Sequence, residues 1–129
     1  MDAATRAAVR HRAEHCCEYC RRRQLDSPLI PLQMEHIIPR KHGGQSNLEN
    51  LALACSECNL HKGSNLSGID PESNQLTPLF HPRRDRWDEH FTWNGLRIVG
   101  LTAVGRTTIR VLELNSAARL RVRLGVRAE

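Results

Sequence analysis

Two neighbouring side chains, those of Glu35 and His36, combine the residue types used in metal-assisted acid-base chemistry. A carboxylate is a preferred ligand of hard divalent cations. An imidazole has an ordinary pKa that lets it accept a proton near neutral pH. Asn50 and Asn59 lie further along the chain and add amide groups. An acid beside a histidine is commonly only a surface ion pair, so the spacing of the surrounding motifs decides between the two interpretations.

Four cysteines form two Cys-x2-Cys pairs on either side of this motif, Cys17 with Cys20 and Cys55 with Cys58. Each pair can supply two thiolates from one tight turn, and two such pairs match a tetrahedral zinc site. Because four thiolates leave no open position for substrate, the zinc is expected to be structural and to contribute to folding. Four buried thiols or a redox pair are the alternatives. Cys16 is a spare thiol that could take the place of Cys17.

Short elements are expected to position the motif residues. Alternating side chains predict a strand at 32–37 and a second strand at 50–55, followed by a short helix that stops at Gly63. Successive strand residues point to opposite faces of a sheet. Glu35 and His36 can therefore share a site only if the first strand ends or bends there.

The remaining segments are expected to form a helix before this core and an extension after it. Asp2 can cap a helix that runs to about His15. We assign residues 1–66 to the core, 67–82 to a connector, and 83–129 to a C-terminal extension that packs on or beside the core. The extension is open to two roles, target recognition or a homodimer or partner-protein interface.

A β-hairpin is expected in this extension around Asn94-Gly95, the strongest short hairpin signal in the chain. In that register Phe91 faces Ile98 and Trp93 faces Leu96, which gives the hairpin one apolar face. The two helices expected after the hairpin span 103–114 and 116–124.

Composition indicates a basic protein, which is compatible with a polyanionic partner but is also explained by solubility alone. The 129 residues carry 19 Lys and Arg against 14 Asp and Glu, a net charge of +5. Residues 24–64 have three basic against four acidic side chains, a net −1, which suits a cation site that also receives phosphate. No apolar run approaches the ~18 residues that span a bilayer. Five cysteines and no hydrophobic leader favour a reducing, cytoplasmic setting without membrane contact.

The combined pattern resembles the HNH endonuclease family, in particular its members with a four-cysteine zinc staple. That family places an acid and a histidine at the end of one strand, then a Gly-rich loop, a central asparagine, and a His or Asn on the next helix. The matching residues are Glu35-His36, Gly43-Gly44, Asn50 and Asn59, with intervals of 14 residues from His36 to Asn50 and 9 from Asn50 to Asn59. The resemblance covers roughly residues 10–65.

This resemblance implies a small ββα-metal core with the zinc staple. Together with the N-terminal helix and the C-terminal hairpin followed by two helices, which the sequence pattern predicts, the expected fold is α+β. It implies that His36 is the general base and that Asn50 stabilises the loop whose backbone carbonyl holds the other ring nitrogen of His36. Glu35 and Asn59 would hold one Mg²⁺ or Mn²⁺ ion. The family more often has Asp where this chain has Glu35, which is one methylene longer.

The implied activity is that of an endodeoxyribonuclease with low sequence specificity, which nicks or cuts DNA and leaves 5′-phosphate and 3′-hydroxyl ends. A non-catalytic zinc-bound nucleic-acid module and a zinc-dependent protein-interaction module are the other interpretations. Basic side chains near the motif could contact phosphates, although a solvated charged face is an equal alternative. The candidate contact residues are Lys62, Arg40, Lys41, His42, Arg22 and Arg23.

Overall fold

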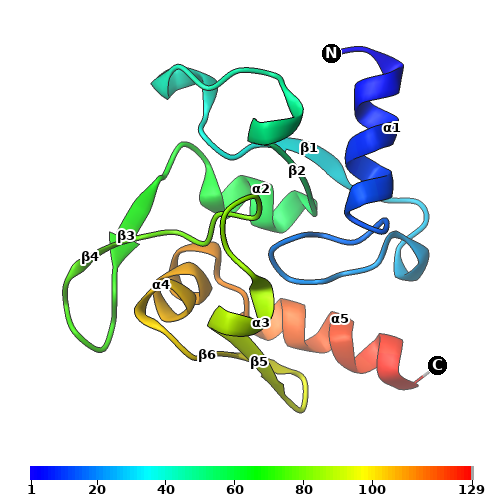
Figure 1. Cartoon of the computed structure of the whole chain (residues 1–129). Coiled ribbons are helices and arrows are strands. Elements are labelled where there is room, and N and C mark those ends of the chain that lie inside the picture. The colour runs from blue at the N-terminus through cyan, green and yellow to red at the C-terminus, as the bar shows by residue number, and fades with distance from the viewer. Residues whose placement is uncertain (129) are drawn as a thin grey trace. The chain divides into compact units, whose positions relative to one another are not determined.

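The motif segment forms an antiparallel pair of strands followed by a helix (Figure 1). The computed structural model describes residues 1–128. These three elements are β1 (Gln33–His36), β2 (Leu51–Ala54) and α2 (Ser56–Lys62). His36 pairs with Leu51, so the end of β1 lies beside the beginning of β2. All four side chains of β2 are buried, which places this strand at the centre of the motif. The predicted α+β core is confirmed.

The N-terminal helix α1 (Ala3–Arg12) starts at Asp2, whose side chain accepts a hydrogen bond of 2.7 Å from the Thr5 N–H. It ends three residues before the predicted boundary. Glu14 and His15 both have positive φ angles, of 54° and 55°. Left-handed backbone cannot continue a helix, so the chain turns here toward the first cysteine pair.

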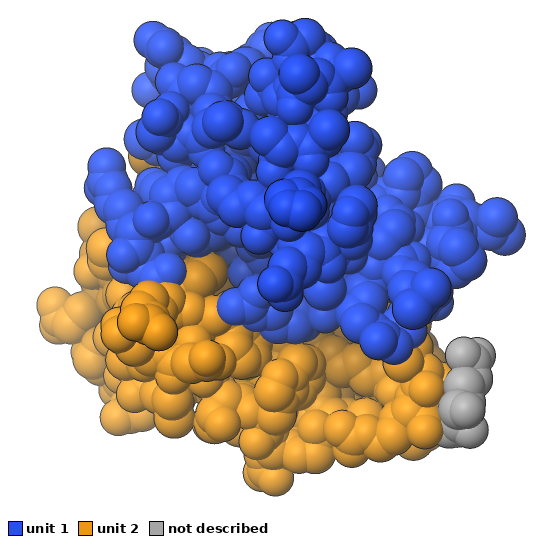
Figure 2. All heavy atoms as spheres, turned by 45° about the vertical axis from the view of Figure 1, so that its right-hand side comes forward, with its two compact units in different colours: residues 1–65, 81–85 blue, residues 66–80, 86–129 orange. Residues whose placement is uncertain are grey.

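The chain divides into two compact units (Figure 2). The first contains residues 1–65 and 81–85, and the second contains residues 66–80 and the chain from Arg86 onward. The stretch expected as a connector therefore contributes a strand pair to the second unit and a short segment to the first. Three single 3₁₀ turns complete the first unit: Gln24–Asp26, Arg40–His42 and Leu48–Asn50.

The second unit contains two β-hairpins and three helices. Its elements are β3 (Ser67–Ile69), β4 (Leu76–Pro78), α3 (Trp87–His90), β5 (Phe91–Asn94), β6 (Arg97–Gly100), α4 (Ala103–Leu112) and α5 (Ala117–Ala128). Phe91 packs against Phe80 and Trp87, with ring centroids 5.3 Å and 5.1 Å away. The predicted hairpin and both predicted helices are present.

The register predicted for the β5–β6 hairpin is wrong. Trp93 pairs with Ile98 and Asn94 with Arg97, which leaves Gly95 and Leu96 as the loop. Gly95 has a φ of 61°. A glycine with positive φ at the first loop position is the pattern of a II′ turn, whereas the prediction used a I′ turn centred one residue earlier.

Candidate functional site

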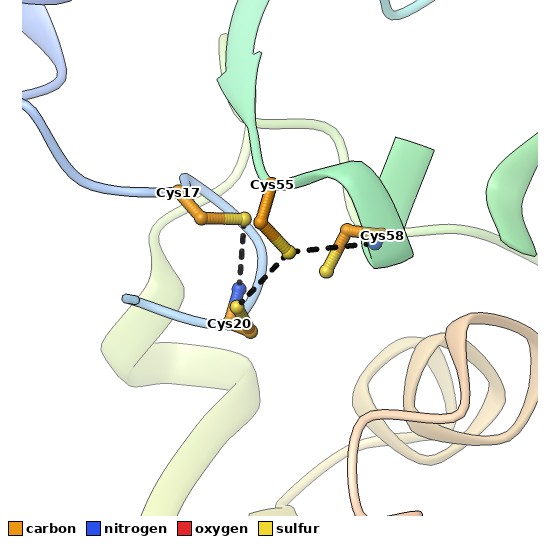
Figure 3. A group of neighbouring side chains, drawn as sticks. All are labelled: Cys17, Cys20, Cys55 and Cys58. Carbon is orange, nitrogen blue, oxygen red and sulfur yellow. Dashed lines mark hydrogen bonds between the residues drawn. The ribbon is translucent and has the colours of Figure 1, made fainter. Parts of the chain in front are cut away.

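The four motif cysteines converge into one cluster (Figure 3). Cys17 and Cys20 lie on the turn after α1, and Cys55 and Cys58 lie at the N-terminus of α2. Their sulfur atoms all lie within 4.8 Å of one another, and all four residues are buried. Tetrahedral zinc with Zn–S bonds of ~2.3 Å separates its sulfurs by about 3.8 Å. The Cys20 and Cys55 sulfurs are 3.7 Å apart, so the cluster fits zinc.

Cys16 lies outside this cluster. Its sulfur lies 3.4 Å from the Glu14 carbonyl oxygen, and the residue is half-buried. The structure therefore settles the choice between the two adjacent cysteines in favour of Cys17. None of the five cysteines forms a disulfide.

Hydrogen bonds lower the pKa values of two of the clustered thiols, and burial raises the pKa values of the other two. The hydrogen bond with Cys17 lowers the pKa of Cys55 to about 6 and also lowers the pKa of Cys20. Burial raises the pKa values of Cys17 and Cys58. Two of the four sulfurs are thus favoured as thiolates, and a dication between them would stabilise the charged form of all four.

Glu18, inside the first cysteine pair, fastens that turn to β2. Its backbone N–H donates to the Leu53 carbonyl, and its Oε2 accepts from the Leu53 N–H, both at 2.8 Å. Its other oxygen is ion-paired with Arg83, from the 81–85 segment of the same unit. The cysteine pairs are therefore aligned by main-chain contacts as well as by the sulfur cluster.

Asn50 ties both ends of the loop that follows β1. Its Oδ1 accepts from the Ile38 N–H at 2.8 Å, and its Nδ2 donates to the carbonyl oxygens of Ile38 and Gln45, both at 2.9 Å. The side chain is 9% exposed, so these bonds are shielded from water. They fix the loop residues that stand next to His36.

The glycine pair lets the backbone of this loop approach β1. Gly43 has a φ of 87°, in the left-handed region. A Cβ atom on Gly44 would lie 1.6 Å from the Ile38 carbonyl oxygen and 2.8 Å from Asn50 Nδ2. The loop therefore has no room for a side chain at Gly44.

Gly44→Ala should lower the free energy of unfolding by about 1–3 kcal/mol, since either the loop or the Asn50 bonds must shift. Urea unfolding monitored by circular dichroism measures this change. Gly125→Ala is the control, because a Cβ at that position of α5 meets no atom within 4 Å, and it should leave stability unchanged or raise it by up to about 1 kcal/mol. Equal urea midpoints for Gly44→Ala and the wild type would contradict the steric argument.

His36 is half-buried at the end of β1, and its ring is held by a hydroxyl group. Its Nε2 lies 2.8 Å from Ser46 Oγ, which also accepts a 3.1 Å hydrogen bond from Arg40. Partial burial lowers the pKa of His36, and the charges of Arg40 and Lys62 act in the same direction. These effects favour the neutral imidazole, the form that can accept a proton. The loop supplies a side-chain hydroxyl in place of the expected backbone carbonyl.

Glu35 points to the opposite side of β1 and is buried against α2. Its Oε2 accepts a 2.7 Å hydrogen bond from the Tyr19 hydroxyl, and its Oε1 lies 2.7 Å from the ammonium nitrogen of Lys62. Burial raises the pKa of Glu35, while Lys62 and Tyr19 oppose that effect. Lys62 also donates to the Ile37 carbonyl at 2.8 Å. The ammonium group thus joins α2 to the end of β1.

These contacts correct the expected role of Lys62. Its side chain is 2% exposed and its ammonium group is bonded to Glu35 and to main-chain carbonyls, so it is not available to a phosphate. When one partner of a buried ion pair is removed, the other charge stays buried without the attraction that offset its desolvation.

Lys62→Met should therefore lower the free energy of unfolding by about 3–5 kcal/mol, because it leaves the Glu35 carboxylate buried without its cation. The double variant Glu35→Gln/Lys62→Met is the matched control, since it removes both charges and keeps an acceptor for Tyr19. We expect it to recover most of the loss. Thermal unfolding of the three proteins makes the comparison, and a single variant as stable as the wild type would refute the assigned pair.

Asn59 lies on the same side of α2 as Lys62 and bonds Gln33 rather than Glu35. Its Nδ2 donates to Gln33 Oε1 at 2.7 Å, and Gln33 and Glu35 share one face of β1. Mg²⁺ and Mn²⁺ prefer oxygen ligands such as a carboxylate and an amide oxygen. Lys62 already supplies positive charge at Glu35, so a cation bound there would have to displace the ammonium group from Oε1.

The two arginines proposed as phosphate contacts in the first cysteine loop have intramolecular partners. Arg22 donates to both Glu57 oxygens at 3.1 and 3.0 Å and to Ser27, and its side chain is 18% exposed. Arg23 is more exposed and forms a two-pronged ion pair with Asp26. Arg22 therefore has a structural role, because it joins the first cysteine turn to α2.

The basic residues on the loop after β1 are better placed for a phosphate. Arg40 and Lys41 are exposed, and Arg40 shares Ser46 with His36. The Nε2 of His42 lies 3.1 Å from the Ser64 carbonyl oxygen. Among the predicted contact residues, Arg40 is thus the one linked directly to His36.

Several residues at the site carried no signal in the sequence. Ser46, Tyr19 and Gln33 each contact a motif residue, Glu18 bonds the main chain of β2, and Arg83 is ion-paired with Glu18. Tyr19 lies inside a Cys-x2-Cys pair and Ser46 follows the glycine pair, but only the packing of α2 on β1 and the path of the loop reveal what they contact.

Comparison with known proteins places the motif in context. Residues 17–65 match the family model described as HNH endonuclease. A curated relative, the Septu protein PtuB of Bacillus thuringiensis, is 30% identical over 106 residues, which are 81% of this chain and 38% of the relative. The chain thus spans well under half of that relative's length. No solved structure matches. Within the described residues, no helix combines the length and apolar character needed to cross a membrane.

Proposed function

We propose that this chain, whose residues 17–65 match the family model described as HNH endonuclease, is a metal-dependent endonuclease that hydrolyses phosphodiester bonds in DNA. The observation that carries this proposal is the setting of His36. Its imidazole is half-buried, is held by a loop that also presents Arg40, and has a pKa lowered first by burial. This hydrolysis needs a base, a positive charge and a carboxylate, and Glu35, which is adjacent to His36 in sequence but on the other side of β1, would supply the carboxylate.

In the proposed reaction, His36 removes a proton from the water molecule whose oxygen attacks phosphorus. The bond from phosphorus to the 3′ oxygen breaks, and this oxygen leaves with its electron pair and is then protonated. Mg²⁺ or Mn²⁺, bound by Glu35 and Asn59, would polarise the phosphate and stabilise the negative charge on the departing oxygen. Arg40, which shares Ser46 with His36, and the exposed Lys41 next to it in sequence would hold the phosphate.

The cysteine cluster has a structural role in this proposal. Four thiolates complete a tetrahedral zinc shell, so this metal would not contact the phosphate. Both pairs lie at the ends of segments that carry site residues, since Tyr19 lies within the first pair and Asn59 follows the second. Zinc would therefore hold Glu35's hydrogen-bond donor and the helix α2 in one arrangement.

The test is to incubate the purified chain with supercoiled plasmid in Mg²⁺, in Mn²⁺ and in EDTA. Conversion to nicked or linear DNA only with a divalent cation supports the proposal. End-labelling should then find 5′-phosphate and 3′-hydroxyl termini. Intact plasmid with both cations, at protein concentrations that bind DNA in a gel-shift assay, would contradict it.

The second candidate is a nucleic-acid-binding module without catalysis. The Glu35–Lys62 pair favours it, because the ammonium group neutralises the carboxylate without any bound cation. This candidate predicts DNA binding that does not require Mg²⁺, and no nicking. The plasmid and gel-shift assays therefore separate the two functions.

A further inference from the structure

Ser46 lies between the two groups that the proposed reaction uses, the ring of His36 and the guanidinium of Arg40. Its Oγ is 2.8 Å from His36 Nε2 and 3.1 Å from Arg40 Nη2. A guanidinium group can only donate hydrogen bonds, so Arg40 occupies one lone pair of the Ser46 oxygen. The second lone pair and the hydroxyl proton remain for His36 and for a third group.

The loop fixes Ser46 through its neighbour. The Gln45 carbonyl oxygen is bonded to Asn50 Nδ2 at 2.9 Å, and Gly44 lies against the Ile38 carbonyl. The backbone next to Ser46 is therefore held by the buried Asn50 side chain, although Ser46 itself is exposed. Packing does not force the exposed Ser46 side chain against His36, so we interpret the contact as one that orients the ring.

The contact has a consequence for the ring proton. A neutral imidazole carries one N–H, and Nε2 is the nitrogen that faces Ser46. If Nε2 carries the proton, it donates to Oγ and leaves Nδ1 bare. If Nδ1 carries the proton, the serine hydroxyl donates to Nε2, and neither nitrogen is free to accept a proton from water. Only the first tautomer lets His36 act as a base.

We propose that Ser46 is a positioning residue that accepts the Nε2–H of His36 and so makes Nδ1 the nitrogen that removes the proton from water. This inference rests on the proposed nuclease function. Ser46 Oγ then accepts two hydrogen bonds, one from His36 and one from Arg40, and its own proton points to a third acceptor. A phosphate oxygen of the substrate, held by Arg40, is the acceptor of the right charge.

Three serine variants of the full chain test this role. Ser46→Ala removes the acceptor, Ser46→Thr keeps a hydroxyl, and Ser64→Ala alters an exposed serine of the same unit whose side chain takes no part in the site. For Ser46→Ala we expect the maximal nicking rate to fall by about 10–100-fold, as for other partners that orient a reactive group. The plasmid concentration that gives half of the maximal nicking rate should change by less than about twofold. The threonine variant should stay within about fivefold of the wild type, and the Ser64 variant should match it.

The nitrogen-15 shifts of the His36 ring provide a second readout, which a merely structural serine would not change. In the wild type, Nε2 should have the shift of a protonated nitrogen and Nδ1 that of a bare one. In Ser46→Ala, the two shifts should move toward each other as both tautomers become populated. Unchanged shifts, or Ser46→Ala nicking at the wild-type rate, would overturn the inference while leaving the nuclease function intact. An inert wild type would instead refute the proposed function and this inference with it.

Discussion

His36→Ala protein should nick supercoiled plasmid about 10²–10⁴-fold more slowly than the wild type, which is the usual contribution of a positioned general base. Alanine cannot accept the water proton, and no other histidine shares the Ser46 contact among the described residues. The lowered pKa of His36, caused first by partial burial, keeps the wild-type imidazole in its proton-accepting form at neutral pH. Initial rates at saturating Mg²⁺ give the comparison.

The loss should appear in turnover and not in folding. His36 is only half-buried and its ring contacts an exposed serine, so thermal unfolding of His36→Ala should remain close to that of the wild type. His11→Ala, an exposed position on α1, is the matched control and should nick at the wild-type rate. If His36→Ala cuts as fast as the His11 variant, another group supplies the base and the proposed mechanism is wrong.

The parts of the fold that depend on local pattern were predictable from the sequence. Alternation in 32–37 and the apolar run before Cys55 indicated β1 and β2, and the matched cysteine pairs indicated the cluster that the structure contains. Each of these signals depends on residue types within a few positions of one another, and sequence records such neighbours directly.

The errors arise where partners come from distant segments. Lys62 has the residue type and position of a surface helix lysine, and only the packing of α2 on β1 turns it toward Glu35. Its positive charge is thereby used inside the protein instead of on DNA. The contact of Ser46 with His36 was also not predictable from the sequence, because a serine in a polar loop is ordinary and only the path of the loop brings it to His36. The hairpin register failed for a local reason, since Gly95 fits either of two turns.

Cys58→Ser should abolish the folded state of the first unit under conditions where the wild type is stable. Structural zinc contributes on the order of 10 kcal/mol to small domains, which is comparable with the whole stability of an ordinary domain, about 5–15 kcal/mol. The serine hydroxyl is a poor replacement for a thiolate, and three sulfurs would leave a zinc position open to water. Hydrogen exchange at the amides of β1 and β2 should therefore become fast in this variant.

Cys16→Ser separates the zinc effect from the general effect of losing a thiol. Cys16 precedes the cluster directly but lies outside it, so this variant should bind about one zinc per chain, as the wild type should. A strong chelator should unfold both proteins by removing the ion, and added zinc should restore them. Slow exchange in β1 and β2 of the Cys58→Ser protein, or zinc content unchanged by that substitution, would show that the cluster does not depend on four thiolates. The alignment of α2 with β1 would then have to come from contacts such as those of Lys62 with Glu35 and of Asn59 with Gln33.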